Sequence, residues 1–478
     1  MARVKNVALA LLVALSFWLS VALWLPPAPT ASVGETPYAA PIRFDREAAP
    51  EALLMPTLSG AAGADGTFLL PPEAPAVAAA FDALRRLPAE RTAPPEDLPP
   101  GRPGGWVLPP AAPAPAAKRP EGGAPGGGAA PDRPPGESAA GEGGRRPEGP
   151  GTAGRSQPRP GLYFAWSVGL SPAFFSRLFP DWPPPTLPEV DALWVAFEEA
   201  GAVATAIDGA TGRAEAWRLQ AEEALVQTAL AGGETIPLVP WAPPPAVFAP
   251  AIPAAGAELS AAVVRAIGLP PEAAAEALLG DLGALREARE RDGTWLLSDG
   301  ARSLRLDPRQ GTLDYFAPAA GRPRPAREAF EAAVAFVNRH AGWGDGDRLL
   351  GIGATADGTV FHFGGTASGF PITGAARAVR DLVVVVDGGE VVRYRRGLFR
   401  WLPPDGDGRA RLPGVQEILT ALEAAGRRPE AVRRSQLVFV GEKTASPDAY
   451  RLVPALLLWA DGDVLVLPPD EAEGRPPG

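Results

Sequence analysis

The residue types that carry most enzyme chemistry are scarce in this chain. Its 478 residues include no cysteine and two histidines, His340 and His362, which excludes thiol catalysis, disulfides and Cys-ligated zinc. His362 lies between Phe361 and Phe363 on a predicted strand and should face away from both. His340 should end a helix, where a cation suits the helix dipole. Neither histidine has the carboxylate partner of a triad or the companion ligands of a metal site.

Paired acids and turn motifs are the remaining candidates for chemistry. Glu198-Glu199 and Glu222-Glu223 have the residue types that a glycosidase uses, but adjacent acids at the ends of elements are usually solvated. Ser298-Asp299-Gly300 lies between two predicted strands, which favours a turn over a catalytic loop. Asp461-Gly462-Asp463 lacks the further oxygen ligands of a calcium loop and reads as a hairpin tip. Phosphate-binding, dinucleotide-binding, zinc-protease and nucleophile-elbow motifs are absent from the sequence. The sequence therefore predicts a protein that is not an enzyme, with no catalytic residues, metal site or cofactor.

The composition indicates which partners are excluded and how much of the chain can be ordered. The net charge of −10 and the pI near 5.1 argue against nucleic-acid binding, which needs a basic surface. A hydrophobic content of 46% is sufficient for packed cores, although 55 Gly and 59 Pro indicate many loops. Residues 109–160 are rich in Gly and Pro with almost no large apolar residues, which predicts a disordered insertion.

The N-terminal region has the pattern of a membrane anchor. Val7–Leu25 contains no charge, and a helix of this length spans about 29 Å, close to the hydrocarbon thickness of a bilayer. Arg3 and Lys5 precede it, so the N-terminus should be cytoplasmic and the body extracytoplasmic. The alternative is a cleaved signal peptide with Ser20-Val21-Ala22 as the cleavage site, although Pro26-Pro27 is a poor context for cleavage. We therefore expect a single-pass protein of the cell membrane.

Small residues within this span could form a helix contact. Ala10 and Ala14 lie four residues apart, as do Ser16 and Ser20, which would let the backbone of a partner helix approach closely. The alternative is that alanine is simply abundant in this chain. These four residues are the predicted partner-helix contact.

The remaining sequence predicts an α+β fold in which antiparallel sheets are each covered by helices. We expect helices over 76–87, after a Ser171 N-cap, over 259–267 and 272–279, from Pro325 and from Val415 up to Gly426. Strands are expected over 162–166, 193–197, 295–297, 304–306, 313–315, 349–354, 359–363, 383–386, 391–394, 437–440, 452–459 and 464–467. The predicted organisation is an anchor (1–25), an N-terminal domain (38–245, interrupted by 109–160), a central domain (246–321) and a C-terminal domain (322–478).

One stretch resembles a known family of bacterial regulators. Gly280–Pro318 contains Asp292-Gly293-Thr294, then Ser298-Asp299-Gly300-Ala301-Arg302-Ser303-Leu304, and then Gly311-Thr312-Leu313-Asp314-Tyr315. These three motifs resemble the YycH family in type and spacing. Leu162–Phe179, Phe361–Pro371 and Arg451–Pro454 are similar to further parts of the family. The Gly/Pro-rich insertion and Ala455-Leu456 depart from the family pattern.

The resemblance implies a function that the residues alone do not. YycH proteins act with the related YycI and restrain the sensor histidine kinase YycG, also called WalK, through transmembrane helices and external domains. The regulator under that kinase controls cell-wall metabolism. The resemblance also implies a C-terminal domain with the fold of YycI, and it supplies no catalytic residues. The alternatives are a PepSY-like extracytoplasmic inhibitory or ligand-binding protein, and an enzyme such as a secreted wall hydrolase, which the scarcity of catalytic residues disfavours.

Overall fold

The structure, a computed structural model, describes residues 47–468 apart from several gaps. The gaps are 64–65, 98–159, 200, 209–210, 232–234, 241–250, 255–256, 269–270, 308, 319–320, 322–323, 341, 375–380, 402–408, 447–448 and 461–462. All described residues belong to one compact unit within residues 43–478. The predicted anchor, with Ala10, Ala14, Ser16 and Ser20, and all but the last residue of the 109–160 insertion lie outside the described residues. None of the helices that are described is long and apolar enough to cross a bilayer.

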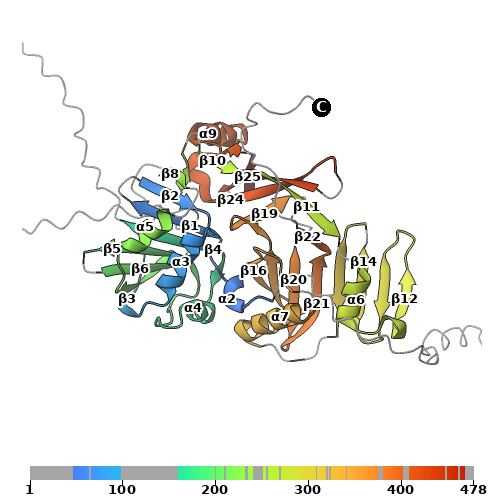
Figure 1. The fold of residues 1–478 in the computed structure, drawn as a ribbon. Helices are drawn as coiled ribbons and strands as arrows, with labels where there is room; N and C mark the ends of the chain where they lie inside the picture. The colour runs from blue at the N-terminus through green and yellow to red at the C-terminus, as the bar shows by residue number, and fades with distance from the viewer. Residues whose placement is uncertain are drawn as a thin grey trace, which may run out of the picture. The chain divides into compact units, whose positions relative to one another are not determined.

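A nine-stranded sheet is formed by the N-terminal half of the described chain (Figure 1). Its order is β3-β7-β6-β5-β4-β1-β2-β8-β9, and all its pairs are antiparallel. The predicted strands 162–166 and 193–197 are confirmed within β4 and β5. The strands are β1 (Leu58–Gly63), β2 (Gly66–Leu70), β3 (Ala89–Asp97), β4 (Gly161–Leu170), β5 (Val190–Glu198), β6 (Gly201–Asp208), β7 (Arg213–Leu219), β8 (Ile236–Pro240) and β9 (Ala251–Pro253).

Helices and an aromatic cluster complete this part of the core. The helices are α2 (Pro50–Leu53), α3 (Pro75–Arg85), α4 (Pro172–Leu178) and α5 (Ala224–Leu230). The predicted helix over 76–87 is confirmed as α3. Ser171 occupies the N-cap position of α4, but its side chain makes no capping hydrogen bond. The Phe175 ring stacks on Phe179 at 4.6 Å and on Trp217 at 5.7 Å between centroids, and Trp217 is fully buried. Aromatic rings thus supply much of the apolar area that stabilises this half.

An eight-stranded antiparallel sheet follows, in the order β12-β13-β14-β15-β21-β20-β17-β16. Because β15 pairs with β21, with Tyr315 opposite Tyr394, one sheet holds strands from both the predicted central and the predicted C-terminal domains. The turns at Asp357-Gly358 and Asp387-Gly388-Gly389 join β16 to β17 and β20 to β21, as the sequence predicts. The strands are β12 (Arg286–Arg289), β13 (Trp295–Ser298), β14 (Ser303–Asp307), β15 (Thr312–Phe316), β16 (Arg348–Thr355), β17 (Gly358–Gly364), β20 (Leu382–Asp387) and β21 (Glu390–Gly397).

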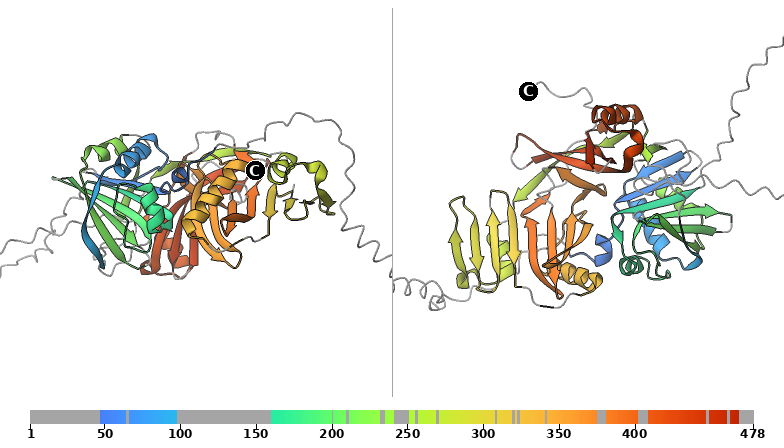
Figure 2. Two further views of the ribbon diagram at one scale, coloured as in Figure 1. Left: turned by 90° about the horizontal axis from the view of Figure 1, so that it is seen from below. Right: turned by 180° about the vertical axis from the view of Figure 1, so that it is seen from behind.

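Helices cover one face of this sheet, and no helix of the described residues covers the other. In Figure 1, α6 (Pro271–Leu279) and α7 (Ala326–His340) lie in front of the strands. In the right-hand view of Figure 2, from behind, the strands face the viewer. The predicted α7 pattern is confirmed, because Phe330, Ala333, Val334 and Val337 are all buried. Phe361 and Phe363 are buried as well, whereas His362 between them is only partly buried, as period two requires.

A third sheet contains the C-terminal strands, and the predicted Val415 helix packs against it. Its order is β18-β19-β24-β25-β11-β22, with β26 also on β25, and α9 buries Ile418 and Leu422 against it. Gly426 follows the end of α9 with a left-handed φ of +67°, as predicted. The pair β19–β24 is parallel, an exception to the antiparallel prediction. The elements are β11 (Ala262–Gly268), β18 (Thr366–Ala367), β19 (Phe370–Gly374), β22 (Phe399–Trp401), β24 (Val432–Lys443), β25 (Ala449–Ala460), β26 (Asp463–Leu467) and α9 (Val415–Ala424).

The predicted helix over 259–267 is wrong, because this segment forms two strands. β10 (Glu258–Ser260) pairs with β23 (Arg409–Arg411), and β11 pairs with β25 through Ala262–Arg265. The side chains alternate, with Leu259 and Val264 buried and Val263 exposed. The alanines had favoured a helix, but β-branched residues suit a pleated surface, and pairing with distant strands overrides local propensity.

The segment that precedes β1 joins α7 to the rest of the molecule. Asn338 Nδ2 donates to the Ala48 carbonyl oxygen at 3.1 Å, and Ala48 N–H donates to Asn338 Oδ1 at 3.0 Å. Trp343 Nε1 donates to the same Oδ1 at 2.8 Å. From α4, Phe174 meets Phe330 of α7 edge to face at 5.2 Å between centroids. The nine-stranded and eight-stranded sheets therefore share one apolar core at this junction.

Candidate functional site

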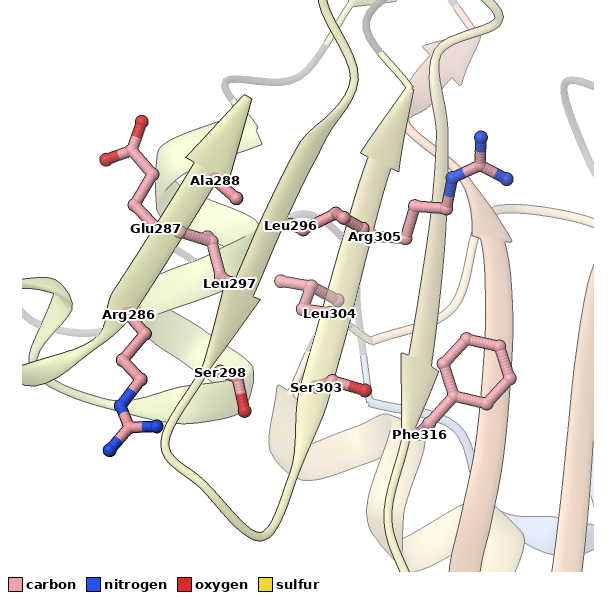
Figure 3. Close-up of a pocket in the computed structure, with 10 residues that line it drawn as sticks. All are labelled: Arg286, Glu287, Ala288, Leu296, Leu297, Ser298, Ser303, Leu304, Arg305 and Phe316. Atoms are coloured by element: carbon pink, nitrogen blue, oxygen red, sulfur yellow. The ribbon is translucent and has the colours of Figure 1, made fainter. Parts of the chain in front are cut away.

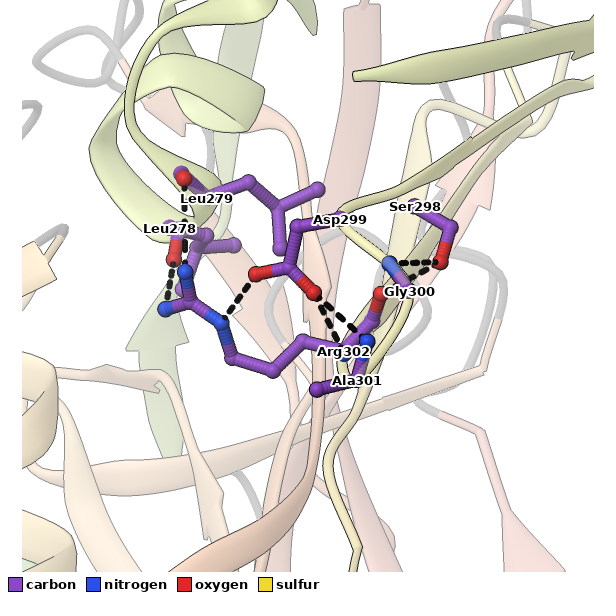
Figure 4. Close-up of polar contacts among 7 residues, drawn as sticks. All are labelled: Leu278, Leu279, Ser298, Asp299, Gly300, Ala301 and Arg302. Atoms are coloured by element: carbon purple, nitrogen blue, oxygen red, sulfur yellow. Dashed lines mark hydrogen bonds and ion pairs between the residues drawn. The ribbon is translucent and has the colours of Figure 1, made fainter. Parts of the chain in front are cut away.

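The turn between β13 and β14 is the motif that carries the sequence resemblance. Asp299 Oδ1 accepts hydrogen bonds from Ala301 N–H at 2.9 Å and Arg302 N–H at 2.7 Å. Ser298 Oγ accepts from Gly300 N–H at 3.0 Å, and Gly300 has a φ of +96° that favours glycine. The predicted turn at Ser298-Asp299-Gly300 is confirmed (Figure 4).

Arg302 connects this turn to the C-terminal end of α6. Its Nε donates to Asp299 Oδ2 at 2.7 Å, while Nη1 and Nη2 donate to the carbonyl oxygens of Leu278 at 3.1 Å and Leu279 at 3.3 Å (Figure 4). The last carbonyls of a helix have no partner within the helix, and a cation near them is favourable. The motif therefore holds α6 against the meander β12–β15, which is a structural role.

The carboxylate of this turn is stabilised in its charged form. Burial alone would raise the pKa of Asp299, but the backbone N–H groups of Arg302 and Ala301, together with the Arg302 guanidinium, hold that pKa below its usual value. A carboxylic acid with a lowered pKa is a poor proton donor near neutral pH. Asp299 is thus a charged partner of Arg302 and not a candidate general acid.

Replacing Arg302 tests this structural role. In Arg302→Met, the carbonyls of Leu278 and Leu279 and the Asp299 carboxylate lose their cationic donor. We expect the free energy of unfolding to fall by about 1–2 kcal/mol, the lower part of the range for charged hydrogen bonds, because the arginine is 39% exposed. Urea unfolding of the purified protein measures this. Arg309→Met, on the next turn of the meander, is the control and should change the value by less than about 0.5 kcal/mol.

His340 also binds the end of α6. Its Nδ1 lies 2.7 Å from the Ala277 carbonyl oxygen, and its ring packs on Phe336 at 4.4 Å between centroids. Burial lowers the pKa of His340, which outweighs the opposite effect of the Ala277 hydrogen bond. His340 is the last residue of α7, as predicted, but its burial disfavours the expected cation. The neutral imidazole is favoured, and it donates to the neighbouring helix.

This histidine predicts a pH dependence of stability. Because its pKa in the folded state lies below the unfolded value of about 6.5, the unfolded chain binds the proton more readily. The free energy of unfolding should therefore fall as the pH drops below about 6.5, and His340→Gln should remove that part of the change. Urea midpoints at several pH values measure it. An identical pH profile in the variant would contradict this role for His340.

The uncovered face of the eight-stranded sheet has a shallow cavity of about 450 Å³ (Figure 3). It crosses four strands, β12 to β15. Leu296 and Phe316 line it and remain 38% and 39% exposed, two of the few large apolar side chains of the described residues that are exposed. The other lining residues are Arg286, Glu287, Ala288, Leu297, Ser298, Ser303, Leu304 and Arg305. Period two did predict one buried face, but the sequence reasoning missed that Leu296 and Phe316 make the opposite face apolar as well.

Arginines surround these two apolar residues. Register places Arg305 beside Leu296 and Arg393 beside Phe316, and the Arg393 guanidinium lies 5.1 Å from the centre of the Phe316 ring. Asp314 lies between Arg393 and Arg395, at 3.8 and 4.0 Å from their nitrogens. The face is therefore basic and partly apolar, and suited to contacts with carboxylates.

The acidic pairs that the sequence singled out lie on the surface of the part of the chain that the structure describes. No group of three or more His, Asp or Glu side chains there is placed to hold a metal ion. Glu198 ends β5 and Glu222 precedes α5, and each of the acids Glu198, Glu199, Glu222 and Glu223 is exposed. An exposed pair of this kind lacks the enclosed setting that raises the pKa of a catalytic acid.

Comparison with solved structures identifies the fold. The crystal structure of YycH from Bacillus subtilis matches this chain with a TM-score of 0.56 and 10% sequence identity, covering 89% of this chain and 98% of the YycH chain. The chain has a YycH-like fold. The YpeB C-terminal domain from Bacillus megaterium matches 43% of the chain at a TM-score of 0.25 and 10% identity, too low to indicate a shared fold. No protein-family model and no curated protein sequence matches the chain.

The YycH-like fold agrees with the motif that pointed to it. The Ser298–Leu304 stretch, which resembles the family in sequence, forms the turn and the Arg302 contacts that join α6 to the meander. The motif therefore indicates the fold and supplies no chemistry of its own. The α+β class predicted from the sequence is confirmed.

Proposed function

We propose that this chain is a non-enzymatic, membrane-anchored regulator of a sensor histidine kinase, acting through protein contacts and linked to cell-wall homeostasis. The observation that carries the proposal is the YycH-like fold over 89% of the chain and 98% of YycH. A single domain of common shape would be weak support, because one fold serves many functions. Correspondence over nearly the whole length of a chain whose described residues form three large sheets and one two-stranded sheet is more specific.

The proposal includes the partners and the topology. The partners would be a YycG-type kinase and a YycI-like protein, and the C-terminal region from residue 322 would have the YycI fold. Val7–Leu25 would cross the membrane with the N-terminus in the cytoplasm. Arg3 and Lys5, which precede the span, support this orientation through the positive-inside bias.

Regulation of this kind requires no chemistry from the protein. A kinase that exists in two conformations responds to any partner that binds one of them better, and small shifts between packed helices suffice to bias such an equilibrium. The test is co-purification of the tagged full-length protein with the kinase and the YycI-like protein from membranes. Recovery of neither partner, from membranes in which all three are present, would overturn the proposal.

The four small residues of the span give a sharper prediction. Ala14→Leu and Ser16→Leu keep the span apolar, so insertion should be normal, but the larger side chains would block close approach of a partner helix around Ala10, Ala14, Ser16 and Ser20. We expect recovery of the kinase to fall severalfold. Ala8→Leu is the control for added volume. Ala8 is two residues from Ala10, a rotation of about 200° around the helix, so the two side chains point to opposite sides. Normal recovery with both variants would mean that the extracytoplasmic body carries the contact alone.

A further inference from the structure

The cavity on the uncovered sheet face combines exposed arginines with exposed apolar side chains. The outer face of an antiparallel sheet is usually polar, and the arginines fit that pattern. Leu296 and Phe316 do not, because both are large, more than a third exposed, and line one cavity of about 450 Å³ (Figure 3). This volume lies within the range of ligand-binding pockets, about 300–1,000 Å³. Exposed apolar side chains grouped in this way commonly mark a binding surface.

The charges around the cavity identify the complementary partner. Arg305, Arg393 and Arg395 have about half of their side-chain area exposed. The acids paired with these three arginines are fewer than the arginines, since Glu290 lies 3.6 Å from Arg305, and Asp314 is shared between Arg393 and Arg395. This positive surface belongs to a chain of net charge −10. The positive charge is therefore confined to this face, and it is complementary to carboxylates.

We propose that this face binds an acidic segment of another protein, with an apolar side chain between Leu296 and Phe316 and carboxylates on Arg305 and Arg393. A dimer in which this face meets the same face of a second copy is disfavoured, because two basic faces would repel each other. The open shape of the cavity across four strands suits a peptide segment. The proposal goes beyond the proposed function, because it holds whether or not the partner is a kinase.

Photo-crosslinking in cells tests the contact on the full-length protein. A photoreactive benzoylphenylalanine replaces Leu296 in one variant and Val466 in the control variant. Val466 is 51% exposed on β26 and is absent from the cavity lining, so it reports the background for an exposed apolar position. Mass spectrometry then identifies the protein and the segment attached to each position.

A charge variant decides whether the contact is electrostatic. Arg305→Gln removes a cation beside the cavity, and Arg409→Gln removes a similar one elsewhere, since both arginines are about half exposed and lie 3.6 Å from a glutamate. With the crosslinker at position 296, we expect Arg305→Gln to reduce the yield about fivefold or more at physiological salt and Arg409→Gln to leave it unchanged. Equal melting temperatures would confirm that neither variant is unfolded.

The expected result is a crosslink at position 296, and not at 466, to a segment of another protein in which Asp and Glu outnumber Lys and Arg. Four results would overturn the proposal: a yield at 296 no higher than at 466, a neutral or basic segment, a segment of this same chain, or a yield that does not depend on Arg305. If the attached protein is neither the kinase nor a partner of the kinase, the docking surface stands, and the co-purification experiment decides the proposed function separately.

Discussion

Replacing Phe330 with alanine should lower the free energy of unfolding by about 3–5 kcal/mol, the usual cost of removing a buried aromatic ring. Phe330 is fully buried on α7. Its ring lies 5.2 Å from Phe174 of α4 and 5.6 Å from Phe361 of β17, measured between centroids. The substitution would leave a cavity at the junction between the two larger sheets, where neither can relax independently. Urea unfolding of the purified protein measures the loss.

Two further variants show whether packing at the junction causes that loss. Phe330→Leu keeps much of the volume and should cost about 1–2 kcal/mol. Phe316→Ala removes the same ring from an exposed position and should cost no more than about 1 kcal/mol, most of it the contact with Arg393. Equal losses for Phe330→Ala and Phe316→Ala would contradict the assignment of the shared core.

The second large effect is expected at Asn338. In Asn338→Ala, the N–H and carbonyl of Ala48 and the Nε1 of Trp343 all lose their partner. Unsatisfied buried polar groups cost about 1–3 kcal/mol each, and because these contacts are only partly buried, we expect a total loss of about 2–3 kcal/mol. The segment before β1 should also detach, so limited proteolysis should cut it faster than in the unmodified protein.

Asn338→Asp distinguishes the hydrogen bonds that Asn338 accepts from the one that it donates. These bonds to Ala48 and Trp343 are called the Asn338 clamp. An aspartate still accepts from Ala48 N–H and Trp343 Nε1, but it cannot donate to the Ala48 carbonyl oxygen. We expect an intermediate loss of stability and intermediate proteolysis. If Asn338→Asp and Asn338→Ala are both cut at the rate of the unmodified protein, the clamp does not hold the segment.

The elements with strong local signals were predictable from the sequence. The α7 spacing of Phe330, Val334 and Val337, and the Asp-Gly turns of the eight-stranded sheet, combine periodicity with turn chemistry in one place. The motif around Asp299 and Arg302, which carried the resemblance, forms a local turn whose arginine binds the end of α6, so its signal lies in consecutive residues.

Features that depend on distant pairing were not predictable. Residues 259–267 read as a helix because nothing local shows that they pair with β23 and β25, which lie far along the chain. The short strands β8 and β9 have too few residues for periodicity to be clear. The basic face escaped notice because Leu296 on β13 and Phe316 on β15 reach the same face only when three strands align, and their alternation with Leu297 and Tyr315 resembled ordinary core.

The measurement that tests the central claim most directly is the rate of autophosphorylation of the sensor kinase, reconstituted in lipid vesicles with and without the full-length protein. Our account predicts that the protein changes this rate severalfold, that the change saturates at a fixed ratio of protein to kinase, and that Ala14→Leu weakens it. A rate that stays the same at every ratio, with both proteins inserted and folded, would contradict regulation through assembly.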